Sequence, residues 1–295
     1  MTRSARSASA SRLCTAAVAL ILLLSSCTGS TAPTTGHPVS LAPLPRPTSA
    51  LPTPKLATLT WKPQIQVSFD FDEGVSSSDK ALIRSSIKQA RGLFPYPHLR
   101  LVRPALVAVF VHQRNGEMTR PNEIAEVRRQ SVHVFVGGDG WKNSDSLQRR
   151  EAMFHEWVHI VQQLESPSRP GPVWLVEGSA EWAAWDAIFR LHLASRSTIG
   201  HMMAQIAAGV DRDRKLKEME GPNFYRDDPD GRDYGLAYAA VESLDPSRGW
   251  RTIIAYYRAL GNGVLWQTAF RRVFKVSVTR FYRSFEASRA TGFAA

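Results

Sequence analysis

Hydrophobic and polar residues change their spacing along the chain, and this change predicts the order of secondary structure. Apolar and polar residues alternate over residues 64–71 (QIQVSFDF), which predicts a β-strand. Residues 99–112, interrupted by Pro104, and residues 130–138 predict two further strands. From Ser144 onward, apolar residues recur mostly at helical spacing, with short breaks.

One helix is predicted among the strands, over residues 76–94. Its apolar residues Leu82, Ile87 and Leu93 have near-helical spacing, and serines and an aspartate precede them as helix-start signals. Strands that come first and helices that follow favour an α+β fold. We therefore expect a small N-terminal mixed or antiparallel sheet with helices, followed by a mostly helical half.

The first residues have the features of a secretory signal. Three arginines precede an apolar run over residues 13–24 (LCTAAVALILLL), which is too short to span a membrane as a mature helix. The run leads into the letters LSSC, ending at Cys27, which resemble the bacterial lipobox. The resemblance implies a lipoprotein signal peptide over residues 1–26, a lipid on Cys27 and an extracytoplasmic protein anchored to the cell membrane. The alternatives are an ordinary signal peptide with an incidental Cys27, and a retained N-terminal anchor.

Residues 27–60 are dominated by Pro, Thr, Ser and Ala, a composition that cannot bury a core. We expect a disordered tether, which at ~3.1 Å per residue reaches on the order of 100 Å. It would hold a domain of residues 61–295 away from the membrane surface.

Charge and cysteine content narrow the classes of function. The 295 residues carry a net charge of +11, which suits anionic lipids or wall polymers, or serves only solubility. The basic residues are scattered and no nucleic-acid-binding motif occurs, so no nucleic-acid partner is expected. Cys14 and Cys27 are the only cysteines, which excludes disulfides, thiolate ligands and cysteine nucleophiles from the predicted domain. Nothing in the sequence indicates an oligomeric state.

Residues 155–159 read HEWVH, the HExxH pattern, within a predicted helix that follows the N-cap candidates at residues 144–146. Histidines four positions apart share one helix face, so His155 and His159 can bind one Zn²⁺. Glu156 would then lie beside the water that the metal activates, as a general base. The alternative is an ordinary helix with two buried histidines and a surface glutamate.

A catalytic zinc site needs a third protein ligand. Metzincins have a histidine six residues after the second histidine and a glycine three residues after it. Glu165 and Gln162 occupy these positions here, which excludes that class. Glu177 lies 18 residues after His159, beyond a break (SPSRPGP) that must turn the chain. Two antiparallel helices joined by this turn would bring Glu177 close to the histidines.

The letters WLVEGSA over residues 174–180, at this distance from HExxH, resemble the gluzincin metallopeptidases of the aminopeptidase-like lineage. The resemblance covers about residues 130–260. It implies a metallopeptidase-like fold that holds Zn²⁺ as its cofactor. The residues implied are the zinc ligands His155, His159 and Glu177, and the general base Glu156.

The same resemblance implies two supporting side chains. Glu181, one turn after Glu177, would accept the second N–H of His155; a solvent-facing glutamate is the alternative. Tyr234, in the letters DYGLAYAAVESLDPSRGW, would donate to the oxyanion, with Tyr238 one turn later as the alternative. A third possibility is that both tyrosines belong to the core.

These observations predict a zinc-dependent peptidase that acts on a peptide or protein substrate. The Gly-x-Met-x-Asn motif with which related aminopeptidases bind a free amino terminus is absent, so we expect endopeptidase-like action. The strand SVHVFV (residues 131–136) would be the sheet edge that holds the substrate backbone. The alternatives are a binding or assembly lipoprotein that keeps the fold without catalysis, and a zinc amidase that acts on cell-wall peptides.

Overall fold

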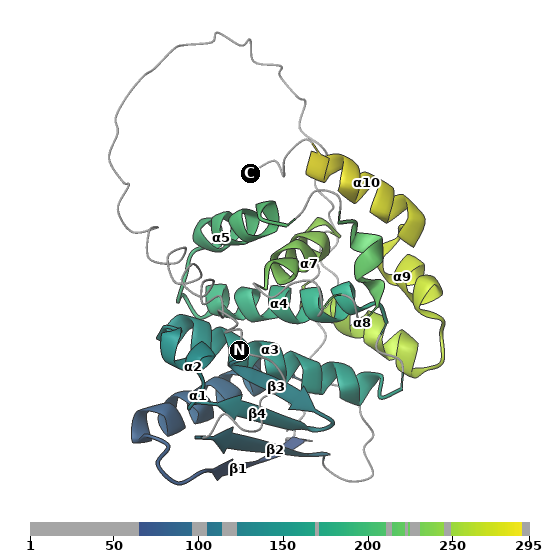
Figure 1. The fold of residues 1–295 in the computed structure, drawn as a ribbon. Helices are drawn as coiled ribbons and strands as arrows, with labels where there is room; N and C mark the ends of the chain where they lie inside the picture. Colours follow the sequence, from purple (N-terminus) through teal and green to yellow (C-terminus); the bar gives the residue numbers. More distant parts are fainter. Residues whose placement is uncertain are drawn as a thin grey trace, which may run out of the picture. The chain divides into compact units, whose positions relative to one another are not determined.

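A computed structural model describes residues 65–95, 105–113, 123–168, 171–210, 214–221, 224, 231–244 and 249–290. The predicted signal peptide, the tether and Cys27 lie outside these residues. Within them, a small sheet is followed by a mostly helical half, which confirms the α+β class (Figure 1).

The sheet is mixed and contains four strands in the order β1-β2-β4-β3. The pairs β1·β2 and β2·β4 are parallel, and the pair β3·β4 is antiparallel. Valines at alternate positions of β2 and β4, such as Val109 and Val132, are fully buried, as the period of two predicts. The strands are β1 (Ile65–Phe71), β2 (Ala105–His112), β3 (Ala125–Arg128) and β4 (Ser131–Phe135).

The prediction that residues 131–136 form a sheet edge is wrong. This segment is β4, which pairs with β2 on one side and with β3 on the other. Among the described strands, the edge on that side is β3. The hydrophobic pattern did not predict β3 because it has four residues and only two of them are apolar. A tight turn with Arg129 at φ 56° folds β3 back onto β4.

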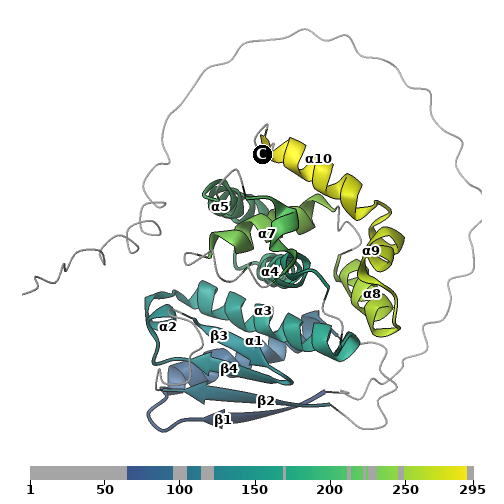
Figure 2. The same ribbon diagram turned by 45° about the vertical axis from the view of Figure 1, so that its right-hand side comes forward.

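The helices pack in layers on one side of the sheet. In both views, α3 lies between the sheet and α4, and α5 and α7 lie on the other side of α4 (Figures 1 and 2). None of the described helices is long and apolar enough to cross a membrane. The helices are α1 (Ser77–Leu93), α2 (Asp139–Asn143), α3 (Ser146–Glu165), α4 (Val173–Arg190), α5 (Arg196–Ala208), α7 (Arg232–Ser243), α8 (Trp250–Gly261), α9 (Trp266–Phe274) and α10 (Val278–Ala290), with the 3₁₀ helix η2 (Leu216–Glu220).

Helix α3 carries the HExxH pattern and is the central helix of the fold. Asp145 caps it by accepting from the backbone N–H groups of Leu147 and Gln148, and the Gln148 side chain completes a capping box. All of residues 153–158 are buried, which is expected of a helix with packing partners on opposite sides. Most of the HExxH segment is therefore buried, and His159 is partly exposed.

A glycine explains how closely α7 approaches α4. A Cβ atom on Gly178 of α4 would lie 2.4 Å from the backbone oxygen of Ala237 in α7. No larger residue fits this contact without moving one helix. The glycine of the WLVEGSA segment thus permits the close packing that brings Tyr234, near the start of α7, towards α3.

Candidate metal centre

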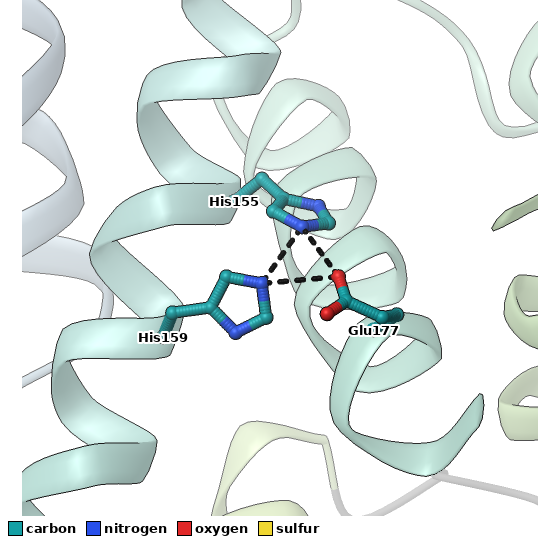
Figure 3. A group of neighbouring side chains, drawn as sticks. All are labelled: His155, His159 and Glu177. Atoms are coloured by element: carbon teal, nitrogen blue, oxygen red, sulfur yellow. Dashed lines mark hydrogen bonds and ion pairs between the residues drawn. The ribbon is translucent and has the colours of Figure 1, made fainter. Parts of the chain in front are cut away.

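Three side chains from two helices converge on one point (Figure 3). The Nε2 atoms of His155 and His159 lie 2.9 Å apart. Oε2 of Glu177 lies 3.3 Å from the first and 3.2 Å from the second. All three residues are buried or nearly so, and their ligand atoms are close enough for one ion to contact all of them.

The antiparallel packing of α3 and α4 produces this convergence. Residues later in α3 contact residues earlier in α4: Gln162 reaches Val176, and His155 reaches Glu181. The chain reverses between the end of α3 at Glu165 and the start of α4 at Val173. Just before α4, Gly171 has φ 88°, and a Cβ atom there would lie 2.6 Å from the hydroxyl of Tyr256.

Each histidine uses its other ring nitrogen for a hydrogen bond within the protein. Nδ1 of His155 lies 3.1 Å from Oε2 of Glu181. Glu181 therefore lies beside His155, the histidine that the sequence analysis predicts as its partner. Nδ1 of His159 lies 2.8 Å from Oε1 of Gln162, a contact that the sequence analysis missed. Residues three positions apart on a helix are neighbours, so the separation of His159 and Gln162 could have predicted this contact.

The hydrogen bonds of Gln162 indicate which ring nitrogen of His159 carries a proton. The amide nitrogen of Gln162 donates to the carbonyl of Val176 and to the hydroxyl of Ser179, both at 3.0 Å. Its oxygen is therefore an acceptor, and Nδ1 of His159 must carry the proton. In the neutral form of His159, the lone pair of Nε2 is then directed at His155 and Glu177.

The same argument applies to His155. Glu181 accepts from Nε1 of Trp185 at 2.8 Å through one oxygen and from Nδ1 of His155 through the other. When both histidines are neutral, the three converging atoms of His155, His159 and Glu177 are all acceptors. Three acceptors within 3.3 Å of one another repel unless a proton or a metal cation lies among them, so this ligand set fits a metal ion that replaces the protons.

Glu151 is a further carboxylate on the outer side of His155. It lies one turn before His155 in α3, and its Oε1 is 4.0 Å from Nδ1 of that histidine. Glu151, His155 and Glu181 also form a group that satisfies simple metal-site geometry. We regard Glu151 and Glu181 as outer partners because they face Nδ1, whereas Nε2 of His155 faces the other two ligand atoms.

The electrostatics of the site favour positive charge at its centre. Burial opposes the charged form of His155, but its hydrogen bonds to Glu177 and Glu181 outweigh burial and raise its pKa well above the usual value. The pKa of His159 is raised too, because Glu177 outweighs burial. Burial would raise the pKa of Glu177, but the two histidines hold it well below the usual value.

Glu156 is buried next to the two histidines on α3. Burial raises its pKa, although His159 and His155 act in the opposite direction. Within the described part of the chain, no hydrogen bond or ion pair engages its carboxylate. The group is thus available to accept a proton from a molecule that enters the site.

The two candidate tyrosines of α7 lie in different surroundings. The ring of Tyr234 is half-buried, with its centroid 5.9 Å from that of His155 and 5.2 Å from that of the buried Phe224. Tyr238 instead lines a cavity with Trp182 of α4. Tyr234 is therefore the tyrosine beside the candidate metal centre.

No family model matches the chain, and neither the curated proteins nor the solved structures include one that is significantly similar to it.

Proposed function

We propose that the chain is a zinc-dependent peptidase of the gluzincin kind. The observation that carries the proposal is the convergence of His155, His159 and Glu177 on one point, with Glu156 next to them in the same helix. Every position that the HExxH chemistry requires is occupied by the residue type it needs. The metallopeptidase-like fold is part of this proposal and rests on the sequence resemblance.

Zinc is the metal that the donor set favours. Two imidazole nitrogens and one carboxylate oxygen are a common ligand set of catalytic zinc, with a fourth position left for water or substrate. A calcium or magnesium site would use oxygen ligands only. The outer partners Glu181 and Gln162 accept from Nδ1 of the two histidines, which favours the neutral tautomer that zinc binding requires, with Nε2 unprotonated.

The side chains around this point have separate roles in the proposed hydrolysis. Bound zinc supplies Lewis acidity to the scissile carbonyl and to the attacking water. Glu156 accepts a proton from that water and passes it to the leaving amine. The hydroxyl of Tyr234 donates a hydrogen bond to the oxygen on which negative charge develops.

A substrate backbone is proposed to lie along β3, the strand at the edge of the sheet. Helix α3 packs against β3, and the carboxylate of Glu126 in this strand is close enough to raise the pKa of Glu156. An edge strand has backbone groups that can pair with an extended peptide, which suits endopeptidase-like cleavage of a peptide or protein.

The test combines zinc content with hydrolysis. The purified protein is expected to contain one zinc per chain by elemental analysis and to cleave members of a random peptide library. Glu156→Gln is expected to keep the zinc and lose cleavage by at least about 10²-fold. Zinc without cleavage by the unmodified protein would favour the non-catalytic binding lipoprotein, and cleavage of wall peptides alone would favour the amidase. Full activity of Glu156→Gln would remove Glu156 from its proposed role.

We also propose that the protein is anchored outside the cell by a lipid on Cys27. The lipobox-like letters LSSC support this, and Cys27→Ser is expected to move the protein from the membrane fraction to the soluble fraction. Unchanged membrane association of Cys27→Ser would contradict the lipid anchor.

A further inference from the structure

A cavity of about 660 Å³ lies between helices α4, α5 and α7. This volume falls in the range of sites that bind small molecules or side chains. Most of its lining is apolar and aromatic. The large side chains of the wall are Trp182, Trp185 and Phe189 of α4, Met203 of α5 and Tyr238 of α7.

The carboxylates in the cavity wall already have partners in the protein. Asp186 pairs with Arg190 at 2.7 Å and with Arg196 at 3.0 Å. The guanidinium of Arg196 also lies 4.2 Å from the centroid of the Phe189 ring. Glu242 accepts a hydrogen bond from the indole N–H of Trp182. Because Asp186 is paired and Glu242 is hydrogen-bonded within the protein, the mostly apolar wall favours a neutral apolar or aromatic group over an ion.

Two wall residues connect the cavity to the metal centre. Trp185 donates to Glu181, which in turn holds His155. Tyr238 lies one turn after Tyr234 in α7. Trp185 follows Glu177 by two helical turns, or about 12 Å along α4. An extended peptide covers that distance in three to four residues.

We propose that this cavity is a substrate subsite for a bulky neutral side chain, aliphatic or aromatic, about three to four residues from the cleaved bond. The inference rests on the proposed peptidase function and adds to it the feature that selects the substrate. The aromatic walls supply the contact area, and they favour a neutral side chain over a charged one.

Gly200 of α5 allows the cavity to be filled without disturbing its walls. It lines the cavity, and a Cβ atom added to it meets no atom within 4 Å. Gly92 of α1 has equally open surroundings and lies in another part of the fold, so Gly92→Leu is the matched control. Ala204→Leu, on the same wall as Gly200, serves as a second filling variant if Gly200→Leu fails to fold.

The first measurement does not depend on catalysis. The neutral aromatic probe N-phenyl-1-naphthylamine is titrated into each variant, and its fluorescence is followed. Gly200→Leu is expected to weaken probe binding at least about tenfold, the loss of one large apolar contact, and Gly92→Leu to leave it unchanged. Equal probe affinity in the two variants and the unmodified protein would overturn the proposal.

The second measurement uses peptides that carry Phe or Ala at successive positions on either side of the cleaved bond. Phe at one position three or four residues away is expected to raise kcat/KM at least about tenfold over Ala, and Gly200→Leu to abolish this preference while Gly92→Leu retains it. Cleavage without such a preference overturns the subsite but leaves the peptidase proposal standing. No cleavage by any protein, with probe binding still sensitive to Gly200→Leu, overturns both the peptidase and the subsite and leaves a ligand cavity.

Discussion

Nδ1 of His159 donates to Oε1 of Gln162 across 2.8 Å, and this bond sets which ring nitrogen faces Glu177. Gln162 is itself fixed by two bonds to α4, from its amide nitrogen to Val176 and Ser179. The histidine is thus oriented by the neighbouring helix as well as by its own. Side chains oriented in this way would bind a metal at a lower conformational cost.

Gln162→Leu removes this orienting acceptor while keeping a side chain of similar size. We expect zinc affinity to fall by about 10–100-fold, the usual effect of losing an outer partner of a metal-bound histidine. Competition with a fluorescent chelator measures the change. Gln267→Leu, an exposed position of α9, is the control. Unaltered zinc affinity in Gln162→Leu would show that the bond to His159 does not support metal binding.

Zinc affinity is expected to decrease as the pH falls. A histidine must lose its proton to bind the metal, and the pKa values of both His155 and His159 lie above the usual ~6.5 in the metal-free site. Protons therefore compete as soon as the pH falls through these raised values, so the loss of affinity begins above about pH 6.5. Glu177, with its lowered pKa, stays ionised over this range. A dissociation constant that stays flat between about pH 9 and pH 6 would contradict this expectation.

Tyr234→Phe tests the proposed oxyanion donor. Removing a single donor of this kind lowers kcat by about 10²–10³-fold, and KM should change little because the bond strengthens in the transition state. Tyr256→Phe is the control, since this buried hydroxyl of α8 has no hydrogen-bond partner in the described part of the chain. If Tyr238→Phe loses kcat and Tyr234→Phe does not, the role passes to Tyr238.

Gly178→Ala tests the close packing of α4 on α7. The added methyl group would lie 2.4 Å from the backbone oxygen of Ala237, so one helix must move. We expect the free energy of unfolding to fall by about 1–3 kcal/mol, measured by denaturant titration. Gly92→Ala, with open space around its Cβ position, should keep or slightly raise stability because alanine favours helices. Equal stabilities of the two variants would mean that α7 adapts without cost.

Much of the secondary structure could be predicted from local patterns. Alternation and helical spacing located β1, α1, β4 and α3, and the cap candidates at residues 144–146 included the observed cap, Asp145. The short strand β3 was not predicted because four residues carry too little periodic signal. Without β3, the sequence pattern wrongly indicated that β4 is the edge of the sheet. An edge depends on which strands pair, and pairing is decided by residues far apart in the chain.

For the candidate site, the sequence by itself determined the side chains whose relationship is local. His155, Glu156 and His159 share a helix, and the spacing of four residues fixes both histidines on one face whatever the rest of the fold does. The tertiary structure alone decided that Glu177 meets the two histidines. It also decided that Gln162 and Glu181 contact their Nδ1 atoms. Finally, it decided that Tyr234, and not Tyr238, lies beside His155. These contacts and the cavity depend on how α3, α4, α5 and α7 pack. That packing is set by shape, such as the missing side chain of Gly178, and no spacing along one helix encodes it.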